Sequence, residues 1–417
     1  MSNLDLSSLA HIPTASAKRI ALRVTPAAEH ALRQGHPWLF DQAIREQSHD
    51  GASGDLAVIF DSQRRFLAIG LYDPHSPIRV RILQHREPAP INREWFAARL
   101  KAAAQIRAAL PANITGYRLV HGENDGLPGL VIDRYDKTLV LELYTSAWMP
   151  HLREVLSILN FVIPIERLVL RLSREVQKQP AHLCGLRDGS VLSGPAIERP
   201  MLFLENGLRF EADPIRGQKT GFFFDQRDNR ARVEKLAGGK SVLNVFAYTG
   251  AFSVYAARGG AREVVSVDIS KPAMKAAQRN FAHNQQHPAV AACRHKTLTG
   301  DAFAVLRQFG NAGQRFDMVI IDPPAFAKQK AEAAQALAAY ERLTRLGLNV
   351  LEPGGIFVQT SCSSRVSAEE FFEAVHRAAR EVGHPLREIE RTGHALDHPI
   401  GFKDGAYLKC MFAVSEH

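Results

Sequence analysis

A glycine turn and a strand-end acid in the C-terminal half of the sequence could together bind a nucleoside. In the segment NVFAYTGAFS an apolar strand runs into a turn at Gly250, where glycine lets the backbone approach a ligand without steric penalty. About twenty residues further on, a second apolar strand ends in Asp268, whose carboxylate could accept hydrogen bonds from both hydroxyls of a ribose. The turn matches neither G-x-x-x-x-G-K-S/T nor G-x-G-x-x-G, which argues against triphosphate and dinucleotide binding.

A third acid, Asp301 in the segment TGDAFAVL, has two interpretations. It could reach the amino group of an adenine, because we expect it at the end of another strand. The helical segment AFAVLRQF follows directly, and aspartate is a preferred N-cap residue, so a helix cap is the favoured interpretation. Enzymes that use nicotinamide and enzymes that use S-adenosylmethionine both combine a glycine turn with a strand-end acid, so these residues leave both cofactors open.

A rigid proline loop follows a further apolar strand. Residues 322–326 read DPPAF, and the prolines at Pro323 and Pro324 fix φ and favour an extended loop. Such a loop could hydrogen-bond the edge of a base through Asp322 and stack the base on Phe326. We therefore expect a reaction site here, in preference to an ordinary proline-rich loop.

A cysteine stands at the end of the next strand, where residues 355–359 lead into TSCSS. A lone cysteine is more often a small buried hydrophobic residue, but its strand-end position and polar neighbours favour Cys362 as a nucleophile. A thiolate that adds to carbon 6 of cytosine makes an enamine, whose carbon 5 can then accept a methyl group. The proton on carbon 5 and the thiolate leave afterwards. Because a free thiol is mostly un-ionised at neutral pH, some local activation of Cys362 is expected.

The elements that position these residues alternate between strand and helix from about Lys240. Strands are expected at residues 241–246, 263–268, 316–321 and 355–360, with helical stretches such as 271–284 and 331–350 between them. Apolar strands that alternate with helices predict an α/β domain with a mostly parallel, doubly wound sheet. In such a sheet ligands bind beyond the carboxyl ends of the strands, where all of the residues above are expected.

The N-terminal half has a different pattern. After a polar, flexible tail (1–18), short strands and one helix indicate a small β-barrel over residues 19–92; the strands are expected at 21–24, 55–60, 66–71 and 78–82, and the helix at 27–33.

A central α+β domain is expected at residues 93–205, and the catalytic domain at 206–417. The central domain begins with a linking helix whose apolar face is formed by Phe96, Leu100, Ala103, Ile106 and Leu110, with Arg107 elsewhere. Further elements are strands at 130–135, 138–144 and 167–172, a helix at 152–159, and a hairpin turn at Asn206-Gly207 between 201–204 and 208–210.

The overall composition points to a globular protein with an acidic partner. The 52 lysines and arginines exceed the 43 aspartates and glutamates, which gives a formal charge of +9 and favours nucleic acid as a partner. The cysteines, Cys184, Cys293, Cys362 and Cys410, are widely separated and form no C-x-x-C pair, so we expect neither a metal site nor a disulfide framework. No signal peptide or long apolar stretch is apparent, so we expect a cytoplasmic protein that does not bind membranes.

Eight motifs occur in the same order in a known family: HPWLF, ENDGLPGLVIDRY, KTGFFFDQRDNR, NVFAYTGAFS, VVSVDIS, DPPAF, TSCSS and AYLK. By these motifs the chain resembles the bacterial large-subunit (23S) ribosomal RNA 5-methylcytosine methyltransferases along nearly its whole length. The resemblance implies an N-terminal PUA-like RNA-binding barrel, a central strand-helix domain and a Rossmann-like class I methyltransferase domain. It also implies S-adenosylmethionine as cofactor, 23S ribosomal RNA as partner, and 5-methylcytosine formation through a covalent cysteine-cytosine adduct.

The same resemblance implies roles for individual residues. Cys362 would be the nucleophile and Asp322 would position the base. The expected cofactor residues are Lys219, Thr220, Gln226, Phe246, Tyr248, Gly250, Asp268 and Asp301, and the expected substrate residues are Pro323, Pro324, Phe326 and Arg227. The sequence departs from the family at Ala251 and Ala325, where some members have glycine and lysine.

A basic cluster precedes the catalytic sheet and would contact RNA; it comprises Arg216, Lys219, Arg227, Arg230 and Arg232. The alternative interpretation of its helical part is an ordinary solvated helix face.

Other functions stay open at this point. A methyltransferase that modifies a base amino group (N6 of adenine or N2 of guanine) can also use a DPP loop, and Cys362 would then be a bystander. An inactive RNA-binding assembly factor is a further alternative, although an intact turn, acid and cysteine argue against it. A nicotinamide dehydrogenase is disfavoured because G-x-G-x-x-G is absent from the sequence. A homodimer is also left open.

Overall fold

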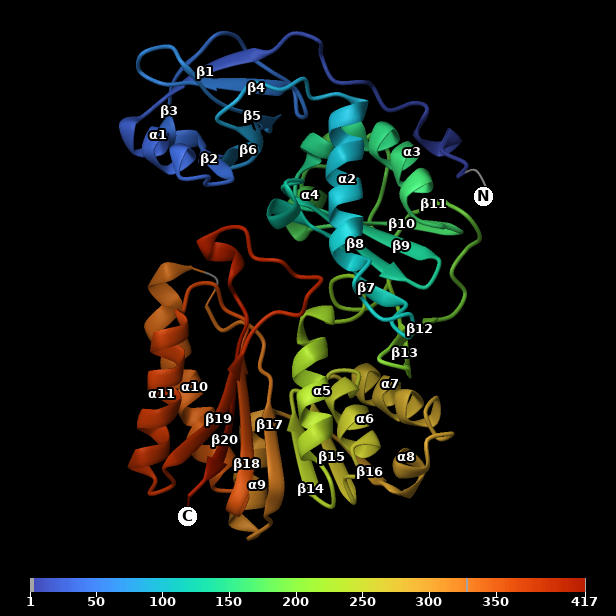
Figure 1. Ribbon diagram of the computed structural model, residues 1–417, viewed down its shortest axis with the longest axis vertical. Coiled ribbons are helices and arrows are strands. Elements are labelled where there is room, and N and C mark those ends of the chain that lie inside the picture. The colour runs from blue at the N-terminus through green and yellow to red at the C-terminus, as the bar shows by residue number, and fades with distance from the viewer. Residues whose placement is uncertain (1–3, 328, 417) are drawn as a thin grey trace. The chain divides into compact units, whose positions relative to one another are not determined.

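The computed structural model describes residues 4–327 and 329–416, and the chain divides into two compact units (Figure 1). The first unit contains the chain up to Asn206, together with Ala212–Phe224 and Leu396–Lys403. The second contains Gly207–Glu211, Asp225–Ala395 and the residues from Asp404 onward. The return of segment 396–403 to the first unit has no counterpart in the sequence pattern.

The first unit begins with a six-stranded sheet in the order β2-β6-β5-β4-β1-β3. Its strands are β1 (Ile20–Val24), β2 (Trp38–Phe40), β3 (Ile44–Gln47), β4 (Leu56–Phe60), β5 (Phe66–Tyr72) and β6 (Ile78–His85). The expected helix is present as α1 (Pro26–Arg33), with Thr25 as N-cap and proline in its first turn. The predicted strands of this region are therefore confirmed, whereas β2 and β3 were not predicted.

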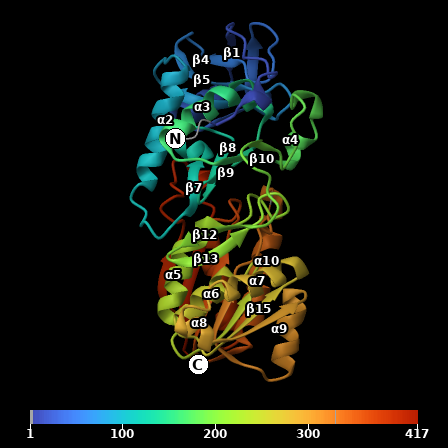
Figure 2. The ribbon, with the colours of Figure 1, turned by 90° about the vertical axis from the view of Figure 1, so that its right-hand side faces the viewer.

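A second sheet of the first unit has the order β11-β10-β9-β8-β7. Its strands are β7 (Gly116–His121), β8 (Leu130–Tyr135), β9 (Thr138–Leu143), β10 (Arg167–Leu172) and β11 (Val191–Ser193). The helices α2 (Arg93–Arg107) and α3 (Leu152–Val162) pack against each other beside this sheet (Figure 2), and a short helix α4 (Arg174–Gln177) follows β10. Most of these elements match the predicted ranges within a few residues.

The buried face of α2 differs from the predicted one. Phe96, Leu100 and Ala103 are buried as expected, but Ile106 is exposed, and Arg107 is the next buried residue of the helix. Arg107 donates two hydrogen bonds of 2.8 Å to the Asp125 carboxylate, and it also donates to three backbone carbonyls. A periodicity count treats arginine as polar, so it could not identify a guanidinium that is buried because all of its donors are satisfied.

The chain crosses between the units at a tight turn between β12 (Met201–Glu205) and β13 (Leu208–Ala212). Asn206 and Gly207 have φ values of 49° and 79°, the positive values that a type I′ turn requires. The predicted turn is therefore confirmed.

The second unit is built on a seven-stranded sheet in the order β16-β15-β14-β17-β18-β20-β19. The strands are β14 (Ser241–Val245), β15 (Glu263–Asp268), β16 (Arg294–Thr299), β17 (Phe316–Ile321), β18 (Leu351–Ser361), β19 (Leu386–Thr392) and β20 (Lys409–Ser415). The five strands β14 to β18 pair in parallel, whereas β20 is antiparallel to both of its neighbours. The predicted doubly wound sheet is confirmed, and β16 is the strand that was expected before Asp301, whereas β19 and β20 were not predicted.

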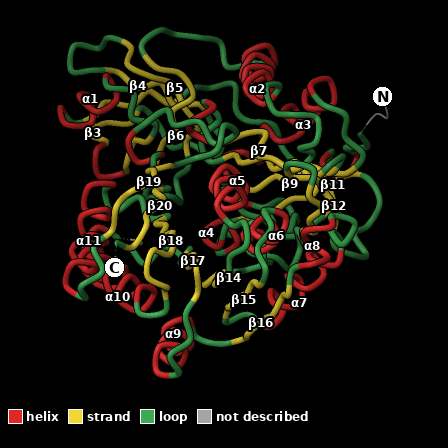
Figure 3. Tube along the Cα trace, turned by 60° about the horizontal axis from the view of Figure 1, so that its bottom comes forward, coloured by secondary structure: helices red, strands yellow, loops and turns green. Residues whose placement is uncertain are grey.

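Two groups of helices accompany this sheet (Figure 3). One group comprises α5 (Arg227–Leu236), α6 (Ala251–Arg258), α7 (Lys271–Ala282) and α8 (Pro288–Ala292). The other comprises α9 (Ala302–Asn311), α10 (Ala333–Leu348) and α11 (Ala368–Glu381), which enclose a core with Phe316, Phe357 and Phe371. Helices on both faces explain why the central strands are buried along nearly their whole length.

The contribution of the buried Arg107 to stability can be compared with that of its exposed neighbour, Ile106. Arg107→Ala should lower the free energy of unfolding by about 3–5 kcal/mol, because it leaves the carboxylate of Asp125 buried without its partner. Ile106→Ala should change it by less than about 1 kcal/mol, because Ile106 is exposed. Urea unfolding followed by tryptophan fluorescence measures both, since Trp38, Trp95 and Trp148 all lie in the first unit. Equal losses would show that Arg107 is not the core residue.

Candidate functional site

Most of the predicted site residues lie at the carboxyl ends of four neighbouring strands. In register, Val245 at the end of β14 pairs with Val267 of β15 on one side and with Ile321 of β17 on the other. Ile321 in turn pairs with Gln359 of β18. Adjacent strands are about 4.8 Å apart, so the glycine turn and the residues directly after β15, β17 and β18 meet at one edge of the sheet. This edge lies where the strand order reverses, the usual ligand position in open α/β sheets.

The turn after β14 is tightly curled. Phe246, Tyr248 and Gly250 have φ values of 62°, 46° and 75°. A Cβ atom at Gly250 would lie 2.7 Å from the Cβ of Ala277, so only glycine fits there. The positive φ at Phe246 and Tyr248 costs on the order of 1 kcal/mol each, and such strain concentrates at ligand sites.

Asp268 holds this turn in place. Its Oδ2 accepts a hydrogen bond of 2.9 Å from the Tyr248 amide, and its Oδ1 accepts one of 2.8 Å from the Ser270 amide. A carboxylate has about four acceptor positions, so the fixed group keeps capacity for two hydroxyl donors. Ile269 is 75% exposed and adds an apolar surface beside the carboxylate. Sequence reasoning missed Ile269, whose only signal is its place next to the strand-end acid.

Asp301 caps a helix, as favoured from the sequence. It is the N-cap residue of α9, and its Oδ1 accepts a hydrogen bond of 2.9 Å from the Ala304 amide. The side chain is exposed at the end of β16, so one carboxylate oxygen stays accessible. Contact with an adenine amino group stays a prediction.

Asp322 follows β17 and is held by two side chains. Its Oδ1 accepts hydrogen bonds from Gln226 Nε2 at 2.8 Å and from Thr360 Oγ1. Burial raises the pKa of Asp322 to about 6, and the nearby charge of Asp225 acts in the same direction. Gln226 also accepts a hydrogen bond of 2.6 Å from Asn229 Nδ2. The side chain of Gln226 therefore orients Asp322, a contact that the sequence did not predict.

Cys362 lies against the proline loop, as predicted. Its thiol is half-buried and donates a weak hydrogen bond of 3.6 Å to the carbonyl of Pro323. Lys409, at the start of β20, is buried nearby and donates to the carbonyls of Ser363 and Tyr407. Burial lowers the pKa of Lys409 to about 8, while the charge of Cys362 acts in the opposite direction. Lys409 is the last residue of the motif AYLK, and the sequence alone predicted no role for it.

The remaining residues of the proline loop differ in exposure. Pro323 is buried and Pro324 is exposed. Phe326 is half-buried, and its ring centre lies 5.2 Å from that of Tyr340, whose hydroxyl accepts a 2.9 Å hydrogen bond from Ser361. Phe326 therefore packs partly into the core, and only its remaining surface is available to stack on a base.

Two expected cofactor residues belong to the first unit. Thr220 is fully buried, and its hydroxyl donates to the carboxylate of Asp133. Lys219 is exposed, with its ammonium 5.3 Å from the ring centre of Phe223. The hydroxyl of Thr220 is thus engaged within the first unit, and a role for either residue in cofactor binding stays a prediction.

The predicted basic cluster is wrong for two of its helical members, because Arg227 and Arg230 are only 1% and 2% exposed. Arg232 is partly exposed and forms an ion pair of 2.8 Å with Glu390, so its contact with RNA stays a prediction. The alternative of a solvated helix face is also wrong at Arg227 and Arg230, since the helix packs these side chains inward. An RNA contact by Arg227 does not fit this burial, whereas Arg216 and Lys219 are exposed.

Within residues 4–327 and 329–416, no group of three or more His, Cys, Asp or Glu side chains could hold a metal ion. Among the described helices, none is long and apolar enough to cross a membrane.

Two protein families match the chain. Residues 176–409 match the S-adenosylmethionine-dependent methyltransferase family, and residues 22–85 match the PUA-like domain. A ribosomal RNA large subunit methyltransferase of Deinococcus radiodurans is 49% identical over 96% of this chain and 98% of its own length. A ribosomal RNA large subunit methyltransferase I of Pseudoalteromonas translucida is 36% identical over 93% of this chain and 98% of its own length.

Solved structures share the fold. A Streptococcus mutans protein described as a SAM-dependent methyltransferase has a TM-score of 0.79 at 22% identity, over 94% of this chain and 99% of its own. A methyltransferase solved in complex with SAH has the same TM-score and identity, over 95% of this chain and 99% of its own. At this identity the likeness concerns the fold alone, and the homodimer that the sequence left open gains no support from it.

The raised pKa of Asp322 has a consequence for stability. Because the folded-state pKa of about 6 lies above the usual 3.8, the protonated form is favoured by folding. This contribution is complete below about pH 4 and is lost as the pH rises through 6. Asp322→Asn, which stays uncharged, should therefore have a free energy of unfolding at pH 8 that is higher than that of the wild type by on the order of 1–3 kcal/mol, and a correspondingly higher melting temperature.

Calorimetry across pH 4 to 8 measures this difference, which should shrink toward pH 4. The matched control is Glu369→Gln, which removes an exposed carboxylate from α11. A difference that stays constant with pH would mean that Asp322 is not destabilised in its charged form.

Proposed function

Since the chain belongs to the S-adenosylmethionine-dependent methyltransferases, and within them to the ribosomal RNA large-subunit methyltransferases, we propose that it methylates carbon 5 of a cytosine in 23S ribosomal RNA. One observation carries the choice of carbon 5: the thiol of Cys362 lies 3.6 Å from the carbonyl of Pro323 in the DPPAF loop. A base held by that loop would present its ring to the thiol. The names of the relatives support ribosomal RNA as the substrate class.

The residues at the strand ends fit the cofactor. S-adenosylmethionine supplies an electrophilic methyl group on a positively charged sulfur. The carboxylate of Asp268, already oriented by two amides, would accept from the ribose hydroxyls. Gly250 lets the turn after β14 pack closely against Ala277, and Ile269 would cover one face of the adenine. Asp301 would accept from the adenine amino group.

Cys362 would act as the nucleophile. Its thiolate forms a bond to carbon 6 of cytosine, and the electron pair displaced toward carbon 5 accepts the methyl group. Loss of the proton from carbon 5 then restores the double bond and breaks the carbon-sulfur bond. The ammonium of Lys409 favours the thiolate over the thiol, because the two groups interact electrostatically.

Asp322 would position the base. Gln226 and Thr360 occupy one carboxylate oxygen, which leaves the other to accept from the exocyclic amine of cytosine. With a pKa of about 6, Asp322 is mostly ionised at pH 7.5 yet can take up a proton more readily than an ordinary aspartate. We therefore also propose that Asp322 accepts the proton that leaves carbon 5, since it is the titratable residue of the DPPAF loop.

The covalent step gives the sharpest test. Cys362→Ala should reduce methyl transfer to ribosomal RNA to near background, because no adduct can form. RNA that contains 5-fluorocytosine should trap the wild type as a covalent complex after methylation, because fluorine does not leave as a proton does. The variant should form no such complex in a denaturing gel.

The matched control is Cys410→Ala, which removes the fully buried thiol of the adjacent strand β20 and should stay active. Wild-type turnover by Cys362→Ala, with methyl groups found on base amino groups by nucleoside mass spectrometry, would favour the amino-group function instead. A wild type that binds the cofactor but methylates no RNA would favour the assembly factor.

Asp268 is testable through cofactor affinity alone. Asp268→Ala should weaken S-adenosylmethionine binding in calorimetry by at least tenfold, since hydrogen bonds to a charged group are worth about 1.5–3 kcal/mol each. Asp268→Asn keeps an acceptor and should lose less. Unchanged affinity of both variants would remove Asp268 from the site.

A further inference from the structure

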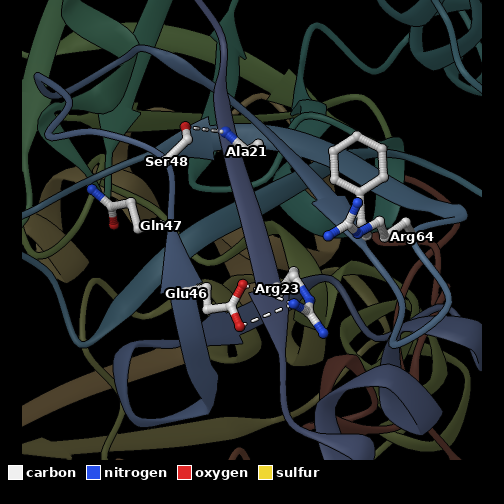
Figure 4. Close-up of a pocket in the computed structure, with 7 residues that line it drawn as sticks. Ala21, Arg23, Glu46, Gln47, Ser48 and Arg64 are labelled. Carbon is white, nitrogen blue, oxygen red and sulfur yellow. Dashed lines mark hydrogen bonds and ion pairs between the residues drawn. The ribbon is translucent and has the colours of Figure 1, made fainter.

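A pocket of about 440 Å³ lies on the first sheet of the first unit, within the PUA-like region (Figure 4). It is lined by Ala21, Arg23, Glu46, Gln47, Ser48, Phe60 and Arg64. These residues come from the neighbouring strands β3, β1 and β4, and from the turn after β4. Its volume lies within the range of small-molecule pockets, and none of its residues takes part in the site described above.

The floor of the pocket is a flat part of the sheet. Arg23 of β1 and Phe60 of β4 are register partners, and the ring of Phe60 is half-exposed beside Ala21. Arg23 is held by Glu46 through two hydrogen bonds of 2.8 and 2.9 Å, so its charge is already neutralised. A half-exposed aromatic ring and a small apolar side chain offer a surface on which a planar base can stack.

Arg64 also lines this pocket, and among the described residues its positive charge, unlike that of Arg23, is not paired with a carboxylate. Figure 4 shows Arg64 on one side, Gln47 on the other, and the Arg23–Glu46 pair between them. In the part of the chain that the structure describes, the Arg64 guanidinium has no ion pair or hydrogen bond. A free guanidinium at the rim of an aromatic-floored pocket suits a phosphate or the face of a base.

The backbone holds Arg64 in an unfavourable conformation. Its φ is 63°, in the left-handed region that glycine tolerates and arginine does not favour. The buried carboxylate of Asp61 fixes the turn, because it accepts from the amides of Gln63 and Arg65 and from the side chains of Arg65 and Arg33. Glycine would relieve this strain, so an arginine at this position lowers the stability of the turn.

We propose that this pocket binds one unpaired nucleotide of the RNA substrate, with its base stacked on Phe60 and its phosphate paired with Arg64. The proposal rests on RNA being the substrate, as proposed above, and adds a second contact to RNA remote in sequence from the reaction site. Gln47 and Ser48 also line the pocket, and hydrogen bonds to Tyr72, His49 and the Ala21 amide fix their side chains there.

The strained turn provides a test in which stability and binding change in opposite directions. Arg64→Gly in the full chain should leave the melting temperature unchanged or raise it, since glycine accepts a positive φ. It should weaken binding of a fluorescein-labelled single-stranded RNA 12-mer about five- to tenfold in anisotropy measurements at 0.15 M salt. The slope of log affinity against log salt should fall by about 0.7, the value for one phosphate of a single strand.

Arg45→Ala is the matched control, because it removes an exposed arginine of β3 that does not line the pocket. Arg64→Lys should keep the salt slope but recover only part of the affinity. Equal losses in Arg64→Gly and Arg45→Ala would overturn the proposal, because the charge would then act non-specifically.

The stacking contact is tested with Phe60→Leu, which keeps apolar bulk and removes the ring. Affinity for the RNA should fall about tenfold, and an abasic RNA of the same length should bind wild type and variant equally. An equal loss with abasic RNA would exclude base stacking.

Methyl transfer at saturating RNA separates this proposal from the proposed function. If pocket variants bind RNA like the wild type while methylation of carbon 5 proceeds, only the pocket proposal fails. If the wild type shows pocket-dependent RNA binding but no methylation of carbon 5, only the proposed function fails.

Discussion

Parallel pairing among β15, β14, β17 and β18 is the constraint on which the candidate site depends. Parallel strands must end at the same edge of the sheet, so the register that pairs Val245 with Ile321 also fixes where the loop after each strand begins. Four short peptide segments, distant in sequence, thereby acquire a common position. The helices on either face supply the apolar burial that holds this register, since a shift by one residue would turn every buried side chain of a strand to the opposite face.

Electrostatics at this edge depend on the same burial. The environment of Asp322 favours its neutral form, and so does that of Lys409, because both groups lose hydration where the sheet meets the proline loop. Both therefore have pKa values closer to neutrality than free side chains, which suits groups that must exchange protons or stabilise a transient charge. The hydrogen bonds from Gln226 and Thr360 oppose the shift of Asp322 and fix its orientation.

The sequence predicted those parts of the fold that are encoded by apolar patterns. The strands at 263–268 and 316–321 were correct to the residue, and Cys362 lies against the proline loop as expected. Strand β19 was missed, and β16 was expected only as a strand before Asp301 without bounds, because both lie at the edges of the sheet, where RHKTLT and LREIERT need not be apolar. The buried positions of Arg107, Arg227 and Arg230 were missed because a charged residue is counted as polar unless its partners are known. The roles of Gln226 and Lys409 depend on contacts between distant segments, which no local pattern encodes.

The place of β20 has a consequence for the order in which the molecule folds. This strand follows β19 in the chain, yet it lies between β18 and β19 in the sheet. Strand β19 therefore has no native neighbour until β20 has been inserted, and residues from 386 onward must assemble together. Lys409 pairs in register with Ser361, directly before the nucleophile candidate, so it arrives in that same event. Any local opening that detaches β20 would thus remove the lysine from Cys362 and expose an unpaired strand edge at once, which links the competence of the site to protection from aggregation.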